Sequence, residues 1–135
     1  MPKVVIIYDS KSGNTETMAK SIAEGAKAVS GVDVVLKKLG EPFSLRILGD
    51  ADALILGSPA HYGHVTLKMS DFLASLRGAQ EAGRLELRGK IGAAFGSYGW
   101  DGGVCIERLG IDLENLGIKV QSPVLAKCPR YLTPL

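Results

Sequence analysis

Four small polar side chains surround a single glycine directly after an apolar run near the N-terminus. The run is Val4 to Tyr8, and the polar segment that follows Asp9 reads Ser10-Lys11-Ser12-Gly13-Asn14-Thr15. A helical pattern begins at once behind this segment, so free backbone N–H groups and the positive end of a helix would point to one place. Hydroxyl, amide and N–H donors converging in this way are suited to bind an anion, and a monophosphate fits best.

Other phosphate-binding loops fit this stretch less well. No Gly-x-Gly-x-x-Gly follows the apolar run, and no Gly-x4-Gly-Lys-Ser/Thr is present, so neither a dinucleotide fingerprint nor a P-loop is indicated. A polar turn that only caps a helix would need just one of the four polar residues. We therefore expect a monophosphate site.

Three segments of the chain resemble the flavodoxin family. Ser10 to Thr15 resembles the Thr/Ser-x-Thr/Ser-Gly-x-Thr loop that holds the monophosphate of FMN in flavodoxins. Ala94 to Gly102 is similar to a stretch in the flavodoxin domain of flavodiiron proteins, and Gly57 to Gly63 is similar to a loop of flavodoxin-fold NAD(P)H:quinone oxidoreductases. The resemblance covers Val4 to roughly Val120 and implies a short-chain, FMN-binding flavodoxin fold.

The resemblance also implies which residues hold the flat, largely apolar ring of FMN. Tyr62, Tyr98 and Trp100 are three of the eight aromatic residues, and they fall in the loops at 58–64 and 96–103. Tyr62 with Trp100 is the preferred stacking pair, although either Tyr98 or Trp100 could stack because glycines let that loop turn in several ways. The expected cofactor-binding residues are Ser10, Lys11, Ser12, Gly13, Asn14, Thr15, Pro59, Ala60, His61, Tyr62, Gly63, Ser97, Tyr98, Gly99, Trp100 and Gly102.

Alternating apolar strands and amphipathic helices must position these loops. Strands are expected at 4–8, 32–36, 53–57, 90–95 and from 118. Three amphipathic helices are expected. The inner face of the first is Met18, Ile22, Ala26 and Val29, and that of the third is Ile106, Leu109, Leu113 and Leu116. The second is expected to be capped by Thr66 and to end at Gly78, with Leu67, Phe72, Leu73 and Leu76 on its inner face. A short helix is expected at 43–48, and a charged surface connection at 80–89. This pattern predicts a doubly wound α/β fold with a five-stranded parallel sheet in the flavodoxin-like order 2-1-3-4-5, which brings the three loops to one crevice.

The last fifteen residues break the alternation. Pro123, Pro129 and Pro134 prevent a helix of useful length, so 1–135 is expected to be a single domain with an extended, non-helical tail at 121–135 and without its last helix. Part of one sheet face would then be uncovered. Either a second polypeptide is expected to cover this face, which predicts a homodimer or a partner-bound form, or the tail covers it through Val124, Leu125, Tyr131 and Leu132.

Composition and charge limit the class of protein. The 46% hydrophobic and 22% charged content is that of a globular protein, and no apolar run is long enough for a membrane span or a signal sequence. The net charge of +2, without a run of basic residues, does not favour nucleic acid, although it differs from the acidic surfaces typical of flavodoxins. Cys105 and Cys128 have no metal-site spacing, which predicts reduced thiols in the cytoplasm.

Two functions remain open from the sequence. The first is an electron carrier in which FMN passes electrons between a reductase or ferredoxin and a redox partner such as a flavodiiron-type acceptor. The second is an FMN-dependent NAD(P)H:quinone oxidoreductase, but such enzymes are longer and add segments that shape a pocket over the flavin. A phospho-acceptor receiver domain lacks its paired acidic residues here, because Asp9 stands alone. His61 and His64 lack a convincing third metal ligand. No catalytic residue is expected.

Overall fold

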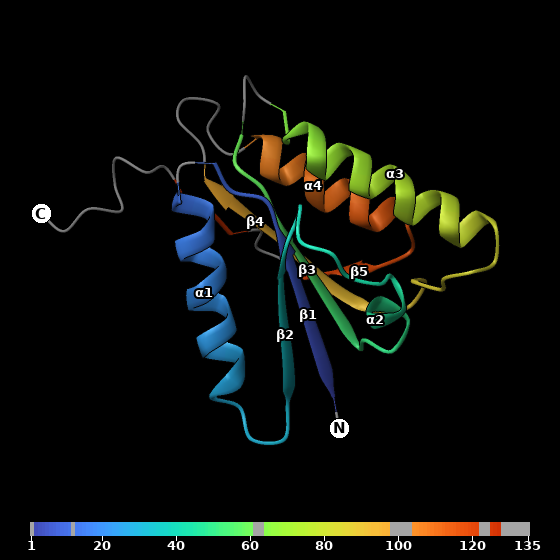
Figure 1. Ribbon diagram of the computed structural model, residues 1–135, viewed down its shortest axis with the longest axis horizontal. Helices are drawn as coiled ribbons and strands as arrows, with labels where there is room; N and C mark the ends of the chain where they lie inside the picture. Colours follow the sequence, from blue (N-terminus) through green and yellow to red (C-terminus); the bar gives the residue numbers. More distant parts are fainter. Residues whose placement is uncertain (1, 12, 61–63, 98–103, 122–124, 128–135) are drawn as a thin grey trace, which may run out of the picture.

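A parallel sheet forms the centre of the computed structural model (Figure 1). The structure describes all residues except 1, 12, 61–63, 98–103, 122–124 and 128–135. The strands are β1 (Lys3–Tyr8), β2 (Asp33–Lys38), β3 (Ala53–Gly57), β4 (Ile91–Ser97), β5 (Lys119–Val120) and β6 (Leu125–Lys127). The helices are α1 (Asn14–Lys27), α2 (Arg46–Gly49), α3 (Leu67–Glu81) and α4 (Val104–Asn115).

The strand order is β2-β1-β3-β4-β5, and all pairs are parallel, which confirms the predicted order. Strand β1 lies between β2 and β3, so that Ile6 pairs with Leu36 on one side and with Ile55 on the other. Val5, Ile6 and Ile7 are completely buried. The unbroken β-branched run is therefore a central strand covered on both faces, as such runs indicate.

The described helices are distributed unequally over the two faces of the sheet. Figure 1 shows α1 on one face and α3 with α4 on the other. On the α1 face, Met18, Ala19 and Ala23 pack on side chains of β1 and β4. The larger core lies on the other face, where buried leucines of β3, α3 and α4 meet.

Glycines at the ends of β3 and β4 allow neighbouring groups to approach closely. A Cβ atom at Gly96 would collide with the carbonyl of Ser58 and with the Ile106 side chain, and one at Gly57 would collide with the Phe95 ring. Glycine at these two positions therefore lets neighbouring elements approach the strands closely.

Two residues that were expected on the inner faces of helices are exposed. Helix α1 ends at Lys27, so Val29, which was expected on its inner face, lies beyond the helix and is 56% exposed. Thr66 does cap α3, since its Oγ1 accepts a hydrogen bond from Met69 N at 3.2 Å. Leu67, however, is 76% exposed, because it is the first residue of the helix and lies off its buried side.

The connection after α3 is more ordered than a charged surface loop. Helix α3 continues past Gly78 to Glu81, and Gly83 rather than Gly78 has a positive φ, of 76°. Leu85 and Leu87 are buried in the core. Gln80 holds this connection, because its Oε1 accepts from Leu87 N at 2.7 Å and its Nε2 donates to Leu116 O at 2.9 Å.

Part of the predicted extended tail is a strand. Strand β6 pairs with β4 in parallel, with Leu125 opposite Phe95 and Lys127 opposite Ser97. Strand β5 pairs with the first residues of β4, at Ile91 and Gly92, so β5 and β6 lie in succession along the same edge. The expected absence of a last helix concerns residues that lie mainly outside those described, and it stays a prediction.

One strip of the sheet is less covered than the rest. On the α1 face, Ile91 is 49% exposed, and Ala93 and Ile55 are only half-buried. On the opposite face, Leu54 and Ala94 are no more than 1% exposed. In this strip, α1 does not cover the first residues of β3 and β4.

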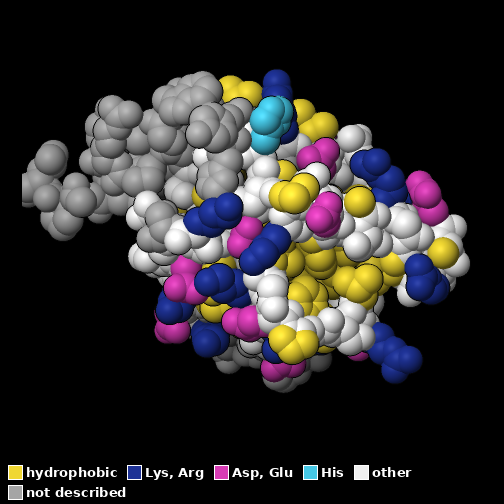
Figure 2. All heavy atoms as spheres, turned by 45° about the horizontal axis from the view of Figure 1, so that its top comes forward, with side chains coloured by type: hydrophobic (Ala, Val, Ile, Leu, Met, Phe, Trp, Pro, Cys, Tyr) yellow, Lys and Arg dark blue, Asp and Glu magenta, His cyan; other side chains and the backbone are white. Residues whose placement is uncertain are grey.

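The surface of the described part carries charges of both signs. Figure 2 shows Lys, Arg, Asp and Glu side chains interspersed over one face, around a hollow with a hydrophobic floor. None of the described helices has the length and apolar character needed to cross a membrane.

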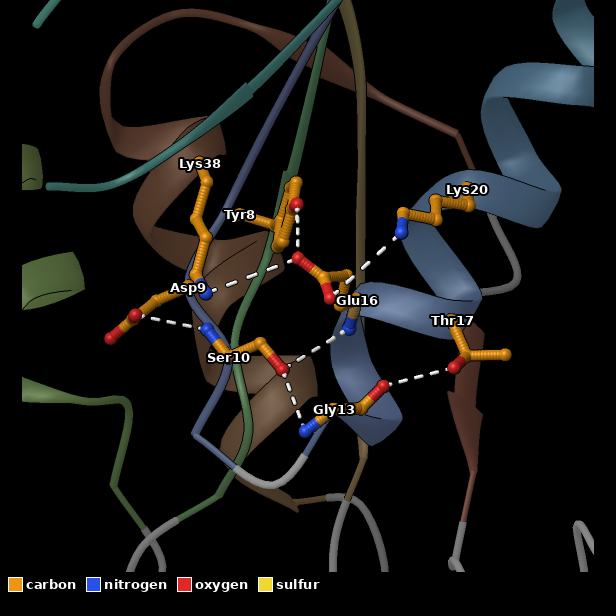
Figure 3. Close-up of polar contacts among 8 residues, drawn as sticks. All are labelled: Tyr8, Asp9, Ser10, Gly13, Glu16, Thr17, Lys20 and Lys38. Atoms are coloured by element: carbon orange, nitrogen blue, oxygen red, sulfur yellow. Dashed lines mark hydrogen bonds and ion pairs between the residues drawn. The ribbon is translucent and has the colours of Figure 1, made fainter. Parts of the chain in front are cut away.

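A polar network joins the start of α1 to β1 and β2. The Tyr8 hydroxyl, on a side chain only 4% exposed, donates to Glu16 Oε1 at 2.8 Å, and Lys38 Nζ and Lys20 Nζ lie 3.9 Å from the Glu16 carboxylate (Figure 3). Burial, followed by the Glu16 hydrogen bond and charge, raises the pKa of Tyr8 to about 12. The hydrogen bond from Tyr8, aided by Lys20 and Lys38 and opposed by desolvation, lowers the pKa of Glu16.

The raised pKa of Tyr8 predicts a loss of stability in alkaline solution. The unfolded chain releases the Tyr8 proton near pH 10, and the folded chain near pH 12, so stability is full below pH 10 and decreases as pH rises through this window. Urea unfolding at pH 9 and pH 11.5 should show a larger decrease in the free energy of unfolding for the wild type than for Tyr8→Phe. An equal decrease in both proteins would contradict the role of Tyr8.

Candidate functional site

The Ser10 hydroxyl organises the predicted phosphate loop. Its Oγ accepts hydrogen bonds from Gly13 N at 3.2 Å and from Glu16 N at 3.3 Å (Figure 3). Gly13, the residue before α1, offers no side chain to cap the helix. Ser10, which lies three residues before Gly13, caps the helix instead. The loop is therefore folded back onto the start of the helix.

Gly13 is required by its backbone conformation. Its φ of 91° lies in the left-handed region, whereas a Cβ atom there would meet nothing within 4 Å. The strain of a side chain would therefore come from φ and not from lack of space. This conformation turns the loop so that Gly13 N points to Ser10.

The hydrogen bonds of Ser10 modify the expected donor set. Two backbone N–H groups that the sequence assigned to the anion are bonded to Ser10 Oγ instead, and Ser10 N donates to Asp9 Oδ1 at 2.9 Å. A hydroxyl that accepts two hydrogen bonds still has its own O–H to donate. Within the described part of the chain, no acceptor for that O–H is found, which leaves it for a ligand.

A buried contact between two hydroxyls joins the phosphate loop to the end of β4. Thr15 Oγ1 and Ser97 Oγ are 2.9 Å apart, and the two residues are 1% and 4% exposed. One hydroxyl donates to the other, so the pair retains one further O–H to donate. Residues separated by 82 positions in the sequence thus present hydroxyls at one place.

The loop after β3 reaches the same place. Ala60 N donates to Ser97 O at 2.8 Å, and Ser58 N donates to Phe95 O at 3.2 Å. The Ser58 hydroxyl in turn accepts from Thr66 N at 3.2 Å, which ties the end of this loop to the cap of α3. The starts of all three predicted loops therefore converge at the carboxyl ends of β1, β3 and β4, where ligands bind in open α/β sheets.

Asp9 is a buried carboxylate beside the site, and the sequence analysis did not predict its burial. Asp9 is 2% exposed. Its Oδ2 atom is buried and has no hydrogen-bond partner among the described residues. Figure 3 shows its carboxylate turned away from Gly13. The available signal was an acidic residue at the end of a buried strand, because such a group is costly to bury unless it has a structural or functional role.

The structure describes half of the predicted cofactor-binding residues. Ser10, Gly13, Thr15 and Ser97 come together as stated, while Lys11 is exposed. Pro59 is buried, and Asn14 and Ala60 are half-buried. The remaining predicted residues lie outside the described ones: Ser12, His61, Tyr62, Gly63, Tyr98, Gly99, Trp100 and Gly102. The stacking pair therefore stays a prediction.

The described residues fit a phosphate group. They offer hydroxyl donors from Ser10 and from the Thr15–Ser97 pair beside the start of a 14-residue helix, whose dipole favours negative charge. Of the two nearest carboxylates, Glu16 is engaged by Tyr8 and by two lysines, and that of Asp9 is turned away from Gly13. A neutral set of hydroxyls at a helix start suits a phosphate monoester.

Comparison with known proteins agrees with this chemistry. The family model described as Flavodoxin matches residues 6–129. A flavodoxin of Aquifex aeolicus (strain VF5) is 42% identical over 104 residues, which make up 76% of this chain and 54% of that protein. The chain thus spans about half the length of this curated relative.

Solved structures share the fold over nearly the whole chain. A flavodoxin from the domain Archaea has a TM-score of 0.81 and 33% identity, with 93% of this chain and 82% of that chain covered. A metal-soaked flavodiiron core from Synechocystis sp. PCC6803 has a TM-score of 0.78 and 25% identity, with 94% of this chain and 30% of that chain covered. With the family model matching most of its residues, and with a parallel sheet whose loops converge on a phosphate-type site, the chain belongs to the flavodoxin family, whose members bind FMN.

Proposed function

We propose that this chain transfers electrons with FMN bound at the ends of β1, β3 and β4, and that it exchanges them between a reductase or ferredoxin and a redox partner. The observation that carries the proposal is the convergence of Ser10, Thr15 and Ser97 hydroxyls from separate loops. FMN supplies reversible one- and two-electron chemistry when bound. Membership of the flavodoxin family and the flavodiiron neighbour support this class of function.

The chain's own residues would bind and orient the phosphate. The O–H of Ser10 would donate to a phosphate oxygen, and the remaining O–H of the Thr15–Ser97 pair would donate to another. Pro59, Ala60 and the other proposed residues of the loops after β3 and β4 would then hold the ring. A flavodiiron-type acceptor is one proposed partner, and we propose a cytoplasmic location for the protein.

The role of Ser10 can be tested with two flavins. Ser10→Ala removes both a phosphate donor and the acceptor for Gly13 N and Glu16 N, so the affinity for FMN is expected to fall by about tenfold or more, the effect of about one lost hydrogen bond. The affinity for riboflavin, which has no phosphate, should change little. Quenching of flavin fluorescence on titration with the apoprotein measures both affinities.

Thr17→Ala is the matched control for this experiment. Thr17 is exposed, and its hydroxyl donates to Gly13 O at 2.9 Å, so it lies beside the loop without offering an O–H to the phosphate. It should retain the wild-type preference for FMN over riboflavin. If Ser10→Ala weakens both flavins by the same factor, Ser10 does not bind phosphate.

Electron transfer itself is tested by anaerobic reduction of the FMN-loaded protein. The flavin absorbance near 450 nm should bleach on photoreduction, should persist with NADPH alone, and should bleach with NADPH once a catalytic amount of ferredoxin–NADP reductase is added. Rapid bleaching by NADPH alone, followed by reoxidation with a quinone, would contradict the carrier proposal and would indicate an NAD(P)H:quinone oxidoreductase. The comparisons do not favour that enzyme.

We also propose that the less covered strip of the sheet forms a homodimer. Ile91, 49% exposed on the α1 face, would lie in the contact, and Ile91→Lys should shift light scattering of the FMN-loaded protein from dimer toward monomer. Ile111→Lys is the control, since Ile111 is 53% exposed on α4, on the opposite face of the sheet. A wild-type protein that is monomeric at micromolar concentration would exclude this contact.

A further inference from the structure

A groove runs beside α3, away from the phosphate loop. A hollow of about 620 Å³ lies between Leu45 and the second half of α3, and another of about 410 Å³ lies between Phe43 and the first half of α3. Leu45 and Ser75 line both hollows, so the two hollows are adjacent. We call this feature the α3 groove, and Figure 2 shows hydrophobic side chains gathered in a hollow on this face.

The floor of the α3 groove is apolar and firmly packed. Leu39, Phe72 and Leu85 contribute to it and are no more than 8% exposed. The rings of Phe43 and Phe72 meet edge to face, with centroids 6.0 Å apart and an interplanar angle of 63°. This packing favours a preformed surface for an apolar chain.

The charges around the α3 groove are unequal at its two ends. Arg46 and Arg84 line the larger hollow, and neither guanidinium makes an ion pair or a side-chain hydrogen bond with any residue that the structure describes. The smaller hollow has Lys68 and Asp71, whose opposite charges offset one another. The groove therefore has one positive end and one end of no net charge.

The backbone places both arginines while leaving their side chains exposed. Arg46 N donates to Ser44 Oγ at 3.2 Å, and Arg84 N donates to Ala79 O at 2.9 Å. Two guanidiniums that line the same apolar hollow, and that have no side-chain partner among the described residues, complement an anionic head with an apolar body.

We propose that the α3 groove binds an amphipathic carboxylate. The head would contact Arg46 and Arg84, and the apolar chain would lie over Leu45 toward Phe72. Helix α3 extends roughly 16 Å from Lys68 to Ala79 at about 1.5 Å per residue, which accommodates a chain of medium length. The volume of the larger hollow is within the range of small-ligand sites, roughly 300–1,000 Å³. This site is separate from the proposed flavin site and does not depend on it.

Calorimetric titration of the FMN-loaded protein with decanoate tests the proposal. Decanoate should bind, and decylammonium, with a similar chain and the opposite charge, should bind at least tenfold more weakly. Arg46→Gln combined with Arg84→Gln should weaken decanoate at least tenfold. The matched control is Arg77→Gln combined with Lys119→Gln, which removes the same charge from exposed positions outside the groove and should leave the affinity unchanged.

A second variant tests the groove itself. Ser75 is exposed and lines both hollows, so Ser75→Trp should fill their junction and abolish decanoate binding without disturbing the core. The proposal is overturned if decanoate does not bind, if decylammonium binds equally well, or if neither the double arginine variant nor Ser75→Trp weakens decanoate. Flavin absorbance measured on the same samples reports separately whether FMN is bound.

Discussion

The buried contact between the Thr15 and Ser97 hydroxyls is the constraint on which the site depends. It can form only if β1 and β4 end at the same level of the sheet, on either side of β3. That arrangement follows from the order β2-β1-β3-β4-β5, because parallel strands connected by right-handed crossovers place their carboxyl ends on one edge. Two hydroxyls removed from water in this way must hydrogen-bond to each other or to a ligand. Separating the loops would leave both hydroxyls without a hydrogen bond, and the free-energy cost of doing so stabilises the arrangement.

The features that followed from local chemistry were predicted well from the sequence. A strand buried on both faces has a continuous apolar run, as Val4 to Tyr8 shows, and Thr66 carries the side-chain oxygen that a helix start requires. The loop at Ser10 was recognised because several small polar residues occur together around one glycine. These signals depend on neighbours in the sequence, and the fold follows once the alternation of strands and helices is established.

The features that depend on distant parts of the chain were not predicted. The end of α3 was placed at Gly78, yet the helix continues because its last turn packs on the core and Gln80 bonds to Leu116, 36 residues later. Strand β6 forms only because β4 offers a free edge beyond β5. The capping of α1 by Ser10 and the burial of Asp9 are likewise consequences of how the loop folds back, which residue types alone do not reveal.

The hydrogen bonds of Ser10 also bear on the thermodynamics of ligand capture. Because Gly13 and Glu16 already donate to Ser10 Oγ, the backbone of the loop has lost much of its conformational freedom before any anion arrives. A preorganised loop gives up little further entropy on binding, so more of each new hydrogen bond contributes to affinity. In the proposed electron carrier, such a loop would keep the cofactor in place while redox partners bind and leave.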